Sequence, residues 1–100
     1  MAVMVIFNSP EMTLENYDSL RPIVNWEQDA PSGLLLHSCA FDESGGLHVF
    51  DLWESAEQMQ DFFGTRLGTA FQQIGVNPPP PLVLPVHNVD AYPGIEKHTP

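Results

Sequence analysis

Two strand-like runs, Leu34–Phe41 (LLLHSCAF) and Gly46–Trp53 (GLHVFDLW), lie on either side of the four residues Asp42-Glu43-Ser44-Gly45. Aspartate, serine and glycine are typical of the turn in a β-hairpin, and the apolar runs beside them are typical of its strands. The second run leads directly into Glu54-Ser55, and Ser55 with Gln58 matches the capping box that starts a helix. The middle of the chain therefore predicts strand, strand, helix.

The segment before this hairpin predicts a strand followed by a helix. Ala2–Phe7 is a short β-branched run closed by Asn8-Ser9-Pro10, which is typical of a buried strand and its end. Thr13 can cap a helix with an apolar stripe that continues to Val24. Because Pro22 lacks an N–H, we expect a kink or a second short turn after Leu20.

The segment after the hairpin predicts a helix followed by a last strand. Apolar residues recur at helical spacing from Ala56 to Ile74, with a break expected near Gly64–Arg66 because glycine weakens a helix. Four prolines, Pro78–Pro81, then connect to the strand-like run Leu82–Val89. Pro85 within that run indicates an edge strand or a bulge.

The predicted order is strand, helix, strand, strand, helix, strand, which is the ferredoxin-like βαββαβ pattern of an α+β fold with a four-stranded antiparallel sheet. In this topology the fourth strand lies at an edge, in agreement with Pro85. We expect one domain over residues 1–89 and a loosely held polar tail over residues 90–100.

Composition excludes several classes of function. The 100 residues carry three Lys and Arg against thirteen Asp and Glu, for a net charge of −10. Such a surface repels phosphate backbones and anionic headgroups, so we expect neither nucleic acid nor membrane as a partner. A single cysteine, Cys39, excludes an internal disulfide, and the apolar opening run is too short for a signal segment. These features predict a cytoplasmic protein.

Both faces of the predicted central strands are apolar. In the first strand Val3, Val5 and Phe7 alternate with Met4 and Ile6. Two helices can cover only one face of a four-stranded sheet, and an uncovered apolar face would exceed the patch size normal for a monomer. We therefore expect a homodimer formed through the sheet.

Three segments together resemble a known group of proteins: Gly33–His37, Gly46–Ser55 and Val86-His87-Asn88. They look like the dimeric α+β barrel proteins, and more narrowly like the antibiotic-biosynthesis-monooxygenase-like branch. The Asp51-x-Trp53-Glu54-Ser55 junction resembles the acidic-x-Trp-x-Ser signature of that branch. This resemblance covers about residues 2–89. Members of the superfamily include cofactor-free oxygenases, haem-degrading enzymes, cyclases, isomerases and proteins without known activity, so the resemblance implies one of these functions. The haem-degrading pattern is disfavoured, because Phe62 and Gln72 stand near the positions of its Trp and His.

The candidate bases are His87, His37 and Asp51. Histidine is the side chain that titrates near neutrality, and His87 is favoured narrowly over His37 because Asn88 follows it on an irregular edge strand. The plain alternative is that each strand histidine is a hydrogen-bonded core or rim residue. Asp51 lies within an apolar strand, where it would be either a base or an acid paired with Arg66, Arg21 or a backbone donor.

A set of polar and aromatic residues is expected to surround the substrate, with Tyr17 or Asn88 as hydrogen-bond donor and Trp53 and Phe62 as walls. The full set of expected substrate contacts is Tyr17, Trp53, Phe62, Arg66, Asn88, Asn8 and His48. The aromatic members would otherwise be ordinary core residues. No ligand spacing for a metal and no phosphate-binding glycine loop is present, so we expect no metal and no cofactor.

Two functions remain open at this point. The resemblance implies a cofactor-free monooxygenase, or a related cyclase, acting by general-base catalysis on a small neutral aromatic or polyketide-like substrate. The alternative is a non-catalytic dimeric module that binds a small molecule or has only a structural role.

Overall fold

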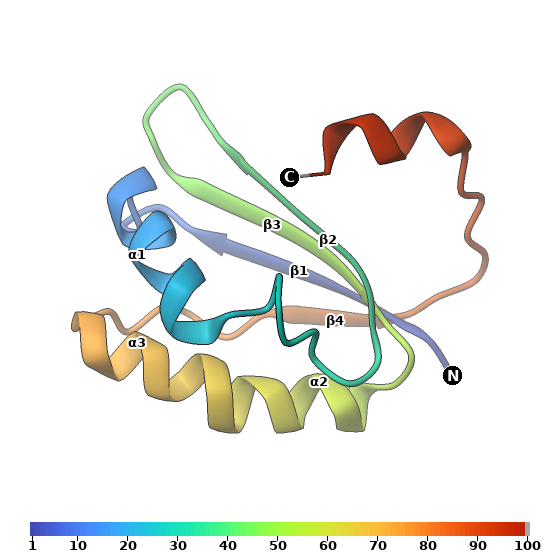
Figure 1. Cartoon of the computed structure of the whole chain (residues 1–100), viewed down its shortest axis with the longest axis horizontal. Helices are drawn as coiled ribbons and strands as arrows, with labels where there is room; N and C mark the ends of the chain where they lie inside the picture. Colours follow the sequence, from blue (N-terminus) through green and yellow to red (C-terminus); the bar gives the residue numbers. More distant parts are fainter. Residues whose placement is uncertain (100) are drawn as a thin grey trace.

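The computed structural model describes residues 1–99 and contains a single four-stranded sheet, with the main helices on one side and a short C-terminal helix on the other (Figure 1). Pro100, the last residue of the predicted tail, lies outside the described residues. The elements in chain order are β1 (Val3–Ser9), α1 (Leu14–Val24), β2 (Leu34–Phe41), β3 (Leu47–Trp53), α2 (Ala56–Phe62), the π-helical η1 (Phe63–Leu67), α3 (Gly68–Ile74), β4 (Leu82–Pro85) and the 3-10 helix η2 (Pro93–His98).

The sheet has the strand order β2-β3-β1-β4, and each neighbouring pair is antiparallel. This confirms the predicted ferredoxin-like α+β fold. One face of the sheet packs against the helices and carries the core, in which Val5 and Trp53 are completely buried and Leu47 and Met12 nearly so. We call this the helix face and the opposite one the open face.

The helices begin and end close to the predicted residues, with two differences. Thr13 and Ser55 cap α1 and α2 as predicted, through hydrogen bonds from the backbone N–H groups of Asn16 and Gln58. Helix α1 does not stop after Leu20 but includes Pro22, whose ring lies on the exposed side. The predicted break near Gly64–Arg66 is instead a π turn that joins α2 to α3 without interrupting the helix.

Strand β4 is shorter than predicted and ends at Pro85 rather than Val89. The N–H of Val86 still donates to the carbonyl of Ala2, at 2.9 Å. The chain then leaves the sheet, because β4 runs antiparallel to β1 with Pro85 opposite Val3, and residues beyond Val86 therefore lie past the start of β1. His87 and Asn88 therefore belong to the exposed segment that leads to η2, which Figure 1 shows on the side of the sheet away from α2 and α3.

The open face of the sheet is apolar, and of the helices only the short η2 lies on that side (Figure 1). Phe50, Leu82 and Leu84 are each between 37% and 54% exposed, and Met4 and Ile6 lie between them on β1. The two-sided apolar pattern expected from the sequence is thus present in the structure, with one side covered and the other largely bare.

Candidate active site

The candidate site begins with a side-chain pair on the helix face of the hairpin. The register of β2 and β3 places His37 directly opposite Asp51. Nδ1 of His37 lies 2.7 Å from Oδ1 of Asp51, and the Asp51 side chain is only 6% exposed. A β-bulge between Leu34 and Leu36 lets both Leu34 and His37 face the helices, because it adds one residue to β2.

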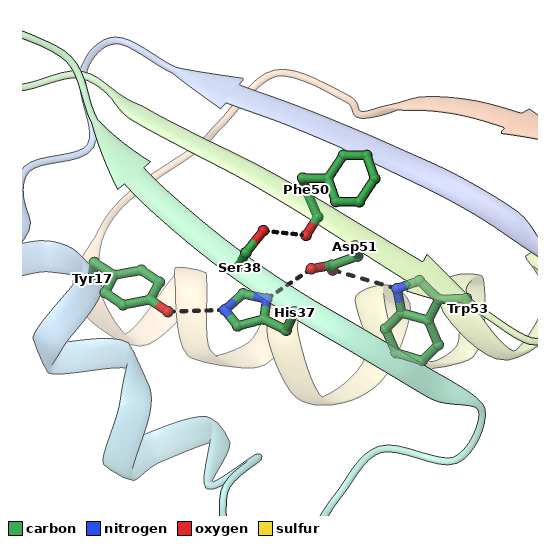
Figure 2. Close-up of polar contacts among 6 residues, drawn as sticks. All are labelled: Tyr17, His37, Ser38, Phe50, Asp51 and Trp53. Carbon is green, nitrogen blue, oxygen red and sulfur yellow. Dashed lines mark hydrogen bonds and ion pairs between the residues drawn. The ribbon is translucent and has the colours of Figure 1, made fainter. Parts of the chain in front are cut away.

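Tyr17 of α1 completes a chain of polar contacts that runs from the helix into the sheet (Figure 2). Its hydroxyl lies 2.9 Å from Nε2 of His37, and the two rings stack with centroids 6.2 Å apart. At the other end, the indole N–H of Trp53 donates to Oδ2 of Asp51 at 3.4 Å. We call Tyr17, His37 and Asp51 the relay.

The hydrogen bonds of the relay assign the proton of the neutral His37 ring. A carboxylate only accepts hydrogen bonds, so Nδ1 carries the proton and donates to Asp51. Nε2 is then the basic nitrogen, and it accepts from the hydroxyl of Tyr17. This is the arrangement of a histidine that can take up a proton at Nε2, with an acid behind it to orient the ring and stabilise the resulting cation.

The relay lies at the wall of a small cavity between the sheet and the helices. Its volume is about 40 Å³, and the rest of its lining is apolar. The lining residues are Phe7, Met12, Tyr17, Leu20, Trp26, Leu34, His37, Leu47, Val49, Asp51, Trp53, Phe62, Phe63, Leu67 and Phe71. A cavity that binds benzene measures roughly 150 Å³. The present cavity can therefore hold water but not an aromatic ring unless part of its wall moves.

Trp26 is part of this wall, and the sequence reasoning missed it. Its ring centroid lies 5.1 Å from that of His37 and 5.8 Å from that of Tyr17. Trp26 follows α1 in a polar loop and belongs to no helical or strand stripe, so periodicity gives no reason to place it near a site. A single large aromatic among polar loop residues is the only local signal that could have identified it.

Burial raises the pKa of the Tyr17 hydroxyl well above its usual range, and the neighbouring Cys39 thiol adds to the effect. The hydroxyl therefore stays protonated at neutral pH, and it acts as a hydrogen-bond donor to His37. Tyr17 is thus suited to hold or pass a proton, and unsuited to be the base itself.

The raised pKa of Tyr17 predicts a loss of stability in alkali. Below about pH 10, the ordinary tyrosine pKa, the side chain is protonated in both folded and unfolded chains and contributes no slope. Above it, only the unfolded chain loses the proton, so the free energy of unfolding should fall by about 1.4 kcal/mol per pH unit. Urea unfolding of the wild type and of Tyr17→Phe between about pH 9 and 11, around the ordinary tyrosine pKa, measures this slope. The same slope in both proteins would contradict the assignment.

The structure does not bring His87 or Asn88 to the site, contrary to the expectation that favoured His87. Both are exposed in the segment beyond β4, and Asn88 donates instead to Asp90 at 3.1 Å. The structure also corrects the expected arginine partners of Asp51. Arg66 contacts the backbone carbonyls of Val24 and Asp29, while Asp51 is paired with His37.

Asn8 and His48 form a separate group on the open face. His48 contacts Oδ1 of Asn8 and Oδ2 of Asp42, each at 2.8 Å, and all three side chains are exposed. The hydrogen bond from His48, with those from the backbone of Gly46 and Ser44, holds the pKa of the Asp42 carboxyl below its usual range. The sheet separates this group from the relay.

Within residues 1–99, no three His, Cys, Asp or Glu side chains converge in a way that could hold a metal ion. No helix in that part of the chain is both long and apolar enough to cross a membrane. The cytoplasmic location expected from composition stays a prediction.

Several solved structures have the same fold. A candidate antibiotic biosynthesis monooxygenase from Chloroflexus aurantiacus J-10-fl superposes with a TM-score of 0.62, covering 90% of this chain and 98% of its own, at 15% identity. A second such candidate, from Caulobacter crescentus CB15, gives 0.64 over 89% and 91%, at 16% identity. SnoaB, a cofactor-independent oxygenase from Streptomyces nogalater, gives 0.62 over 88% and 94%, at 8% identity.

No protein-family pattern and no curated protein matches the sequence. The resemblance to the antibiotic-biosynthesis-monooxygenase-like proteins is therefore confirmed at the level of the fold, and the chemistry has to be argued from the residues of this chain.

Proposed function

We propose that this protein is a small monooxygenase that needs no bound cofactor and uses His37 as its general base. The observation that carries the proposal is a histidine whose two ring nitrogens are both engaged, by Asp51 at 2.7 Å and Tyr17 at 2.9 Å, at the wall of an aromatic cavity. The shared fold with a cofactor-independent oxygenase supports it.

Proton removal follows from the hydrogen bonds of the relay. A substrate hydroxyl or an acidic C–H gives its proton to the oxygen of Tyr17, while the Tyr17 proton moves to Nε2 of His37. The imidazolium that forms is stabilised by the carboxylate of Asp51. Tyr17, with its hydroxyl restored, then donates a hydrogen bond to the substrate anion. General-base catalysis of this kind contributes about 10²–10⁴ in rate.

The electron-rich anion is the species that reduces O₂ in this proposal. One oxygen atom ends on the substrate carbon and the other leaves as water, with the substrate supplying the electrons. The walls formed by Trp53, Phe62 and Phe63 favour a planar, uncharged aromatic or polyketide-like substrate and keep water away from the anion. The same base would serve a cyclase, in which the anion attacks a carbonyl of its own chain.

The experiment combines binding with oxygen uptake. Hydroxylated aromatic polyketides are titrated against the protein while tryptophan fluorescence reports binding, and an oxygen electrode reports turnover. The proposal expects both signals from the same compounds. Binding without oxygen uptake and without a new product would favour the non-catalytic module, and cyclised product without oxygen uptake would favour the cyclase.

We also propose that the open face is the interface of a homodimer. Phe50, Leu82 and Leu84 expose large apolar side chains there, and a second sheet of the same kind would cover them. A stable interface of this type buries about 800 Å² on each partner.

A charge in the middle of the open face should separate the two subunits. Phe50→Glu is expected to be a monomer by light scattering at micromolar concentration, because a buried carboxylate would lack a partner. Leu14→Glu is the matched control, since Leu14 is 56% exposed on α1, away from this face, and should remain dimeric. A monomeric wild type, or a dimeric Phe50→Glu variant, would contradict the interface.

A further inference from the structure

The loop that carries Trp26 covers the outer side of the relay. We call residues 25–30 the Trp26 loop. It follows α1 at Val24 and ends before Pro31, which is buried. Every residue of the loop except Trp26 is exposed, while the Trp26 ring packs against both His37 and Tyr17. The loop therefore has one inward anchor, and that anchor lies on the candidate base.

Arg66 fastens the two ends of the Trp26 loop to each other and to the helix. Its Nη2 donates to the carbonyl of Val24 and to that of Asp29, each at 2.7 Å. Arg66 belongs to the π turn η1, and its guanidinium lies 5.4 Å above the ring of Phe62, a wall of the cavity. π turns of this kind are frequent at functional sites. Arg21 of α1 also contacts this loop, through an ion pair with Glu27. Its side chain and that of Glu27 are 35% and 44% exposed, and exposed ion pairs of this kind add little stability.

The Trp26 loop starts where the backbone turns out of α1 at its C-cap, Asn25, and ends before β2. Asn25 has φ 61° and ψ 38°, and it is the only residue other than glycine with positive φ among residues 1–99. At the far side Gly33 has φ 87°, and its carbonyl accepts from the N–H of Glu54 at 2.7 Å, which fixes the chain where β2 begins. The segment between Asn25 and Gly33 is thus short, with a left-handed residue at its start and a hydrogen bond to Glu54 at its end.

The size of the cavity requires a wall to move before a ring can enter. At about 40 Å³ it is far below the roughly 150 Å³ that holds benzene. Of the aromatic wall residues, Trp26 is the one carried by an exposed loop, whereas Trp53 and Phe62 belong to the core. Moving Trp26 outward would vacate a planar, indole-sized space against the ring of His37.

We infer that the Trp26 loop is a lid that Arg66 latches, and that Trp26 occupies the place where a planar, uncharged aromatic ligand packs against His37. This inference rests on the proposed function for the identity of the site. Arg66 is then a positioning residue that controls entry, although it contacts neither the ligand nor the relay.

The first test needs no ligand and uses the quenching of tryptophan fluorescence by acrylamide. In a Trp53→Phe background, Trp26 is the only tryptophan. The same variants are also measured with Trp53 in place, because a fully buried tryptophan is little quenched by acrylamide. Arg66→Met should increase the quenching of Trp26 several-fold, and Arg66→Lys should restore part of the protection. Arg21→Met is the matched control, with the same change of charge beside the same loop. Equal quenching in the Arg66→Met and Arg21→Met variants would overturn the latch.

The second test uses 2-naphthol as an uncharged planar probe and stopped-flow fluorescence. Arg66→Met should raise the association rate about tenfold, the effect of losing about one charge-assisted hydrogen bond, and Arg21→Met should leave it unchanged. Trp26→Ala should bind the probe more tightly than the wild type, because the probe no longer has to displace the indole ring. If Trp26→Ala folds but binds the probe no better than the wild type, Trp26 does not occupy the ligand's place. If Trp26→Ala does not fold, Trp26→Phe is used for the same comparison.

A third variant separates this inference from the proposed function. His37→Gln should lower turnover by about 10²–10⁴. In that background, the Arg66→Met and Arg21→Met variants should still differ in the quenching of Trp26. If that difference is found while no variant affects turnover, the lid stands and the histidine base is wrong. If turnover depends on His37 while the difference is absent, the base stands and the lid is wrong.

Discussion

Replacing His37 with glutamine is expected to lower turnover by about 10²–10⁴, the usual loss when a general base is removed. The glutamine amide can still donate to the carboxylate of Asp51, but it has no nitrogen that takes up a proton. The buried carboxylate thus keeps a partner, and the thermal midpoint should change little. His37→Ala should lose the same activity and also stability, because it leaves Asp51, only 6% exposed, without its main partner.

His48→Gln and His87→Gln are the controls for this experiment. Both histidines are exposed and neither lines the cavity, so each variant should retain wild-type turnover. Turnover and thermal midpoint are measured for all three glutamine variants. If none loses turnover selectively, the histidine base is wrong and Asp51 becomes the next candidate.

Asp51→Asn should lower turnover by about 10⁴, as the same change does in the Asp–His pair of a hydrolase triad. The asparagine amide can turn an N–H toward Nδ1 of His37, and the ring then carries its proton on Nε2. In that tautomer Nε2 cannot accept from Tyr17, so the relay is blocked although every side chain is in place. NMR of the ring nitrogens of His37 should show the change of tautomer directly.

Asp42→Asn is the matched control for Asp51→Asn, because Asp42 also faces a histidine, His48, at 2.8 Å. That pair lies at the surface on the open face, so its loss should not affect turnover. An Asp51→Asn variant that keeps the Nδ1–H tautomer and wild-type turnover would show that Asp51 does not orient the base.

The fold could be predicted because it depends on local patterns that survive in a single sequence. Alternation in β1 and β3, the turn at Asp42–Gly45 and the caps at Thr13 and Ser55 each act within a few residues. The predicted interruptions at Pro22 in α1 and near Gly64 in η1 rest on local helix propensity alone. Tertiary packing overrides that propensity, and the helix continues at both places.

The site was harder to predict because it depends on register. His37 and Asp51 were both recognised as candidates, but their pairing across the hairpin needs the position of the bulge, which no single residue reveals. The preference for His87 assumed a strand continuing to Val89, and the end of β4 at Pro85 removes that assumption. Trp26 reaches His37 only through the path of its loop, which no periodicity describes.

The bulge in β2 also determines which changes of chain length this site can tolerate. The bulge lies between Leu34, where β2 begins, and His37. The tight turn after Phe41, at the end of β2, holds His37 in register with Asp51. An insertion or deletion between α1 and Gly33 can therefore be absorbed before the bulge, without rotating His37 to the other face of the sheet. The Trp26 loop can thus diverge in length and sequence between related chains, while His37 and Asp51 stay in register.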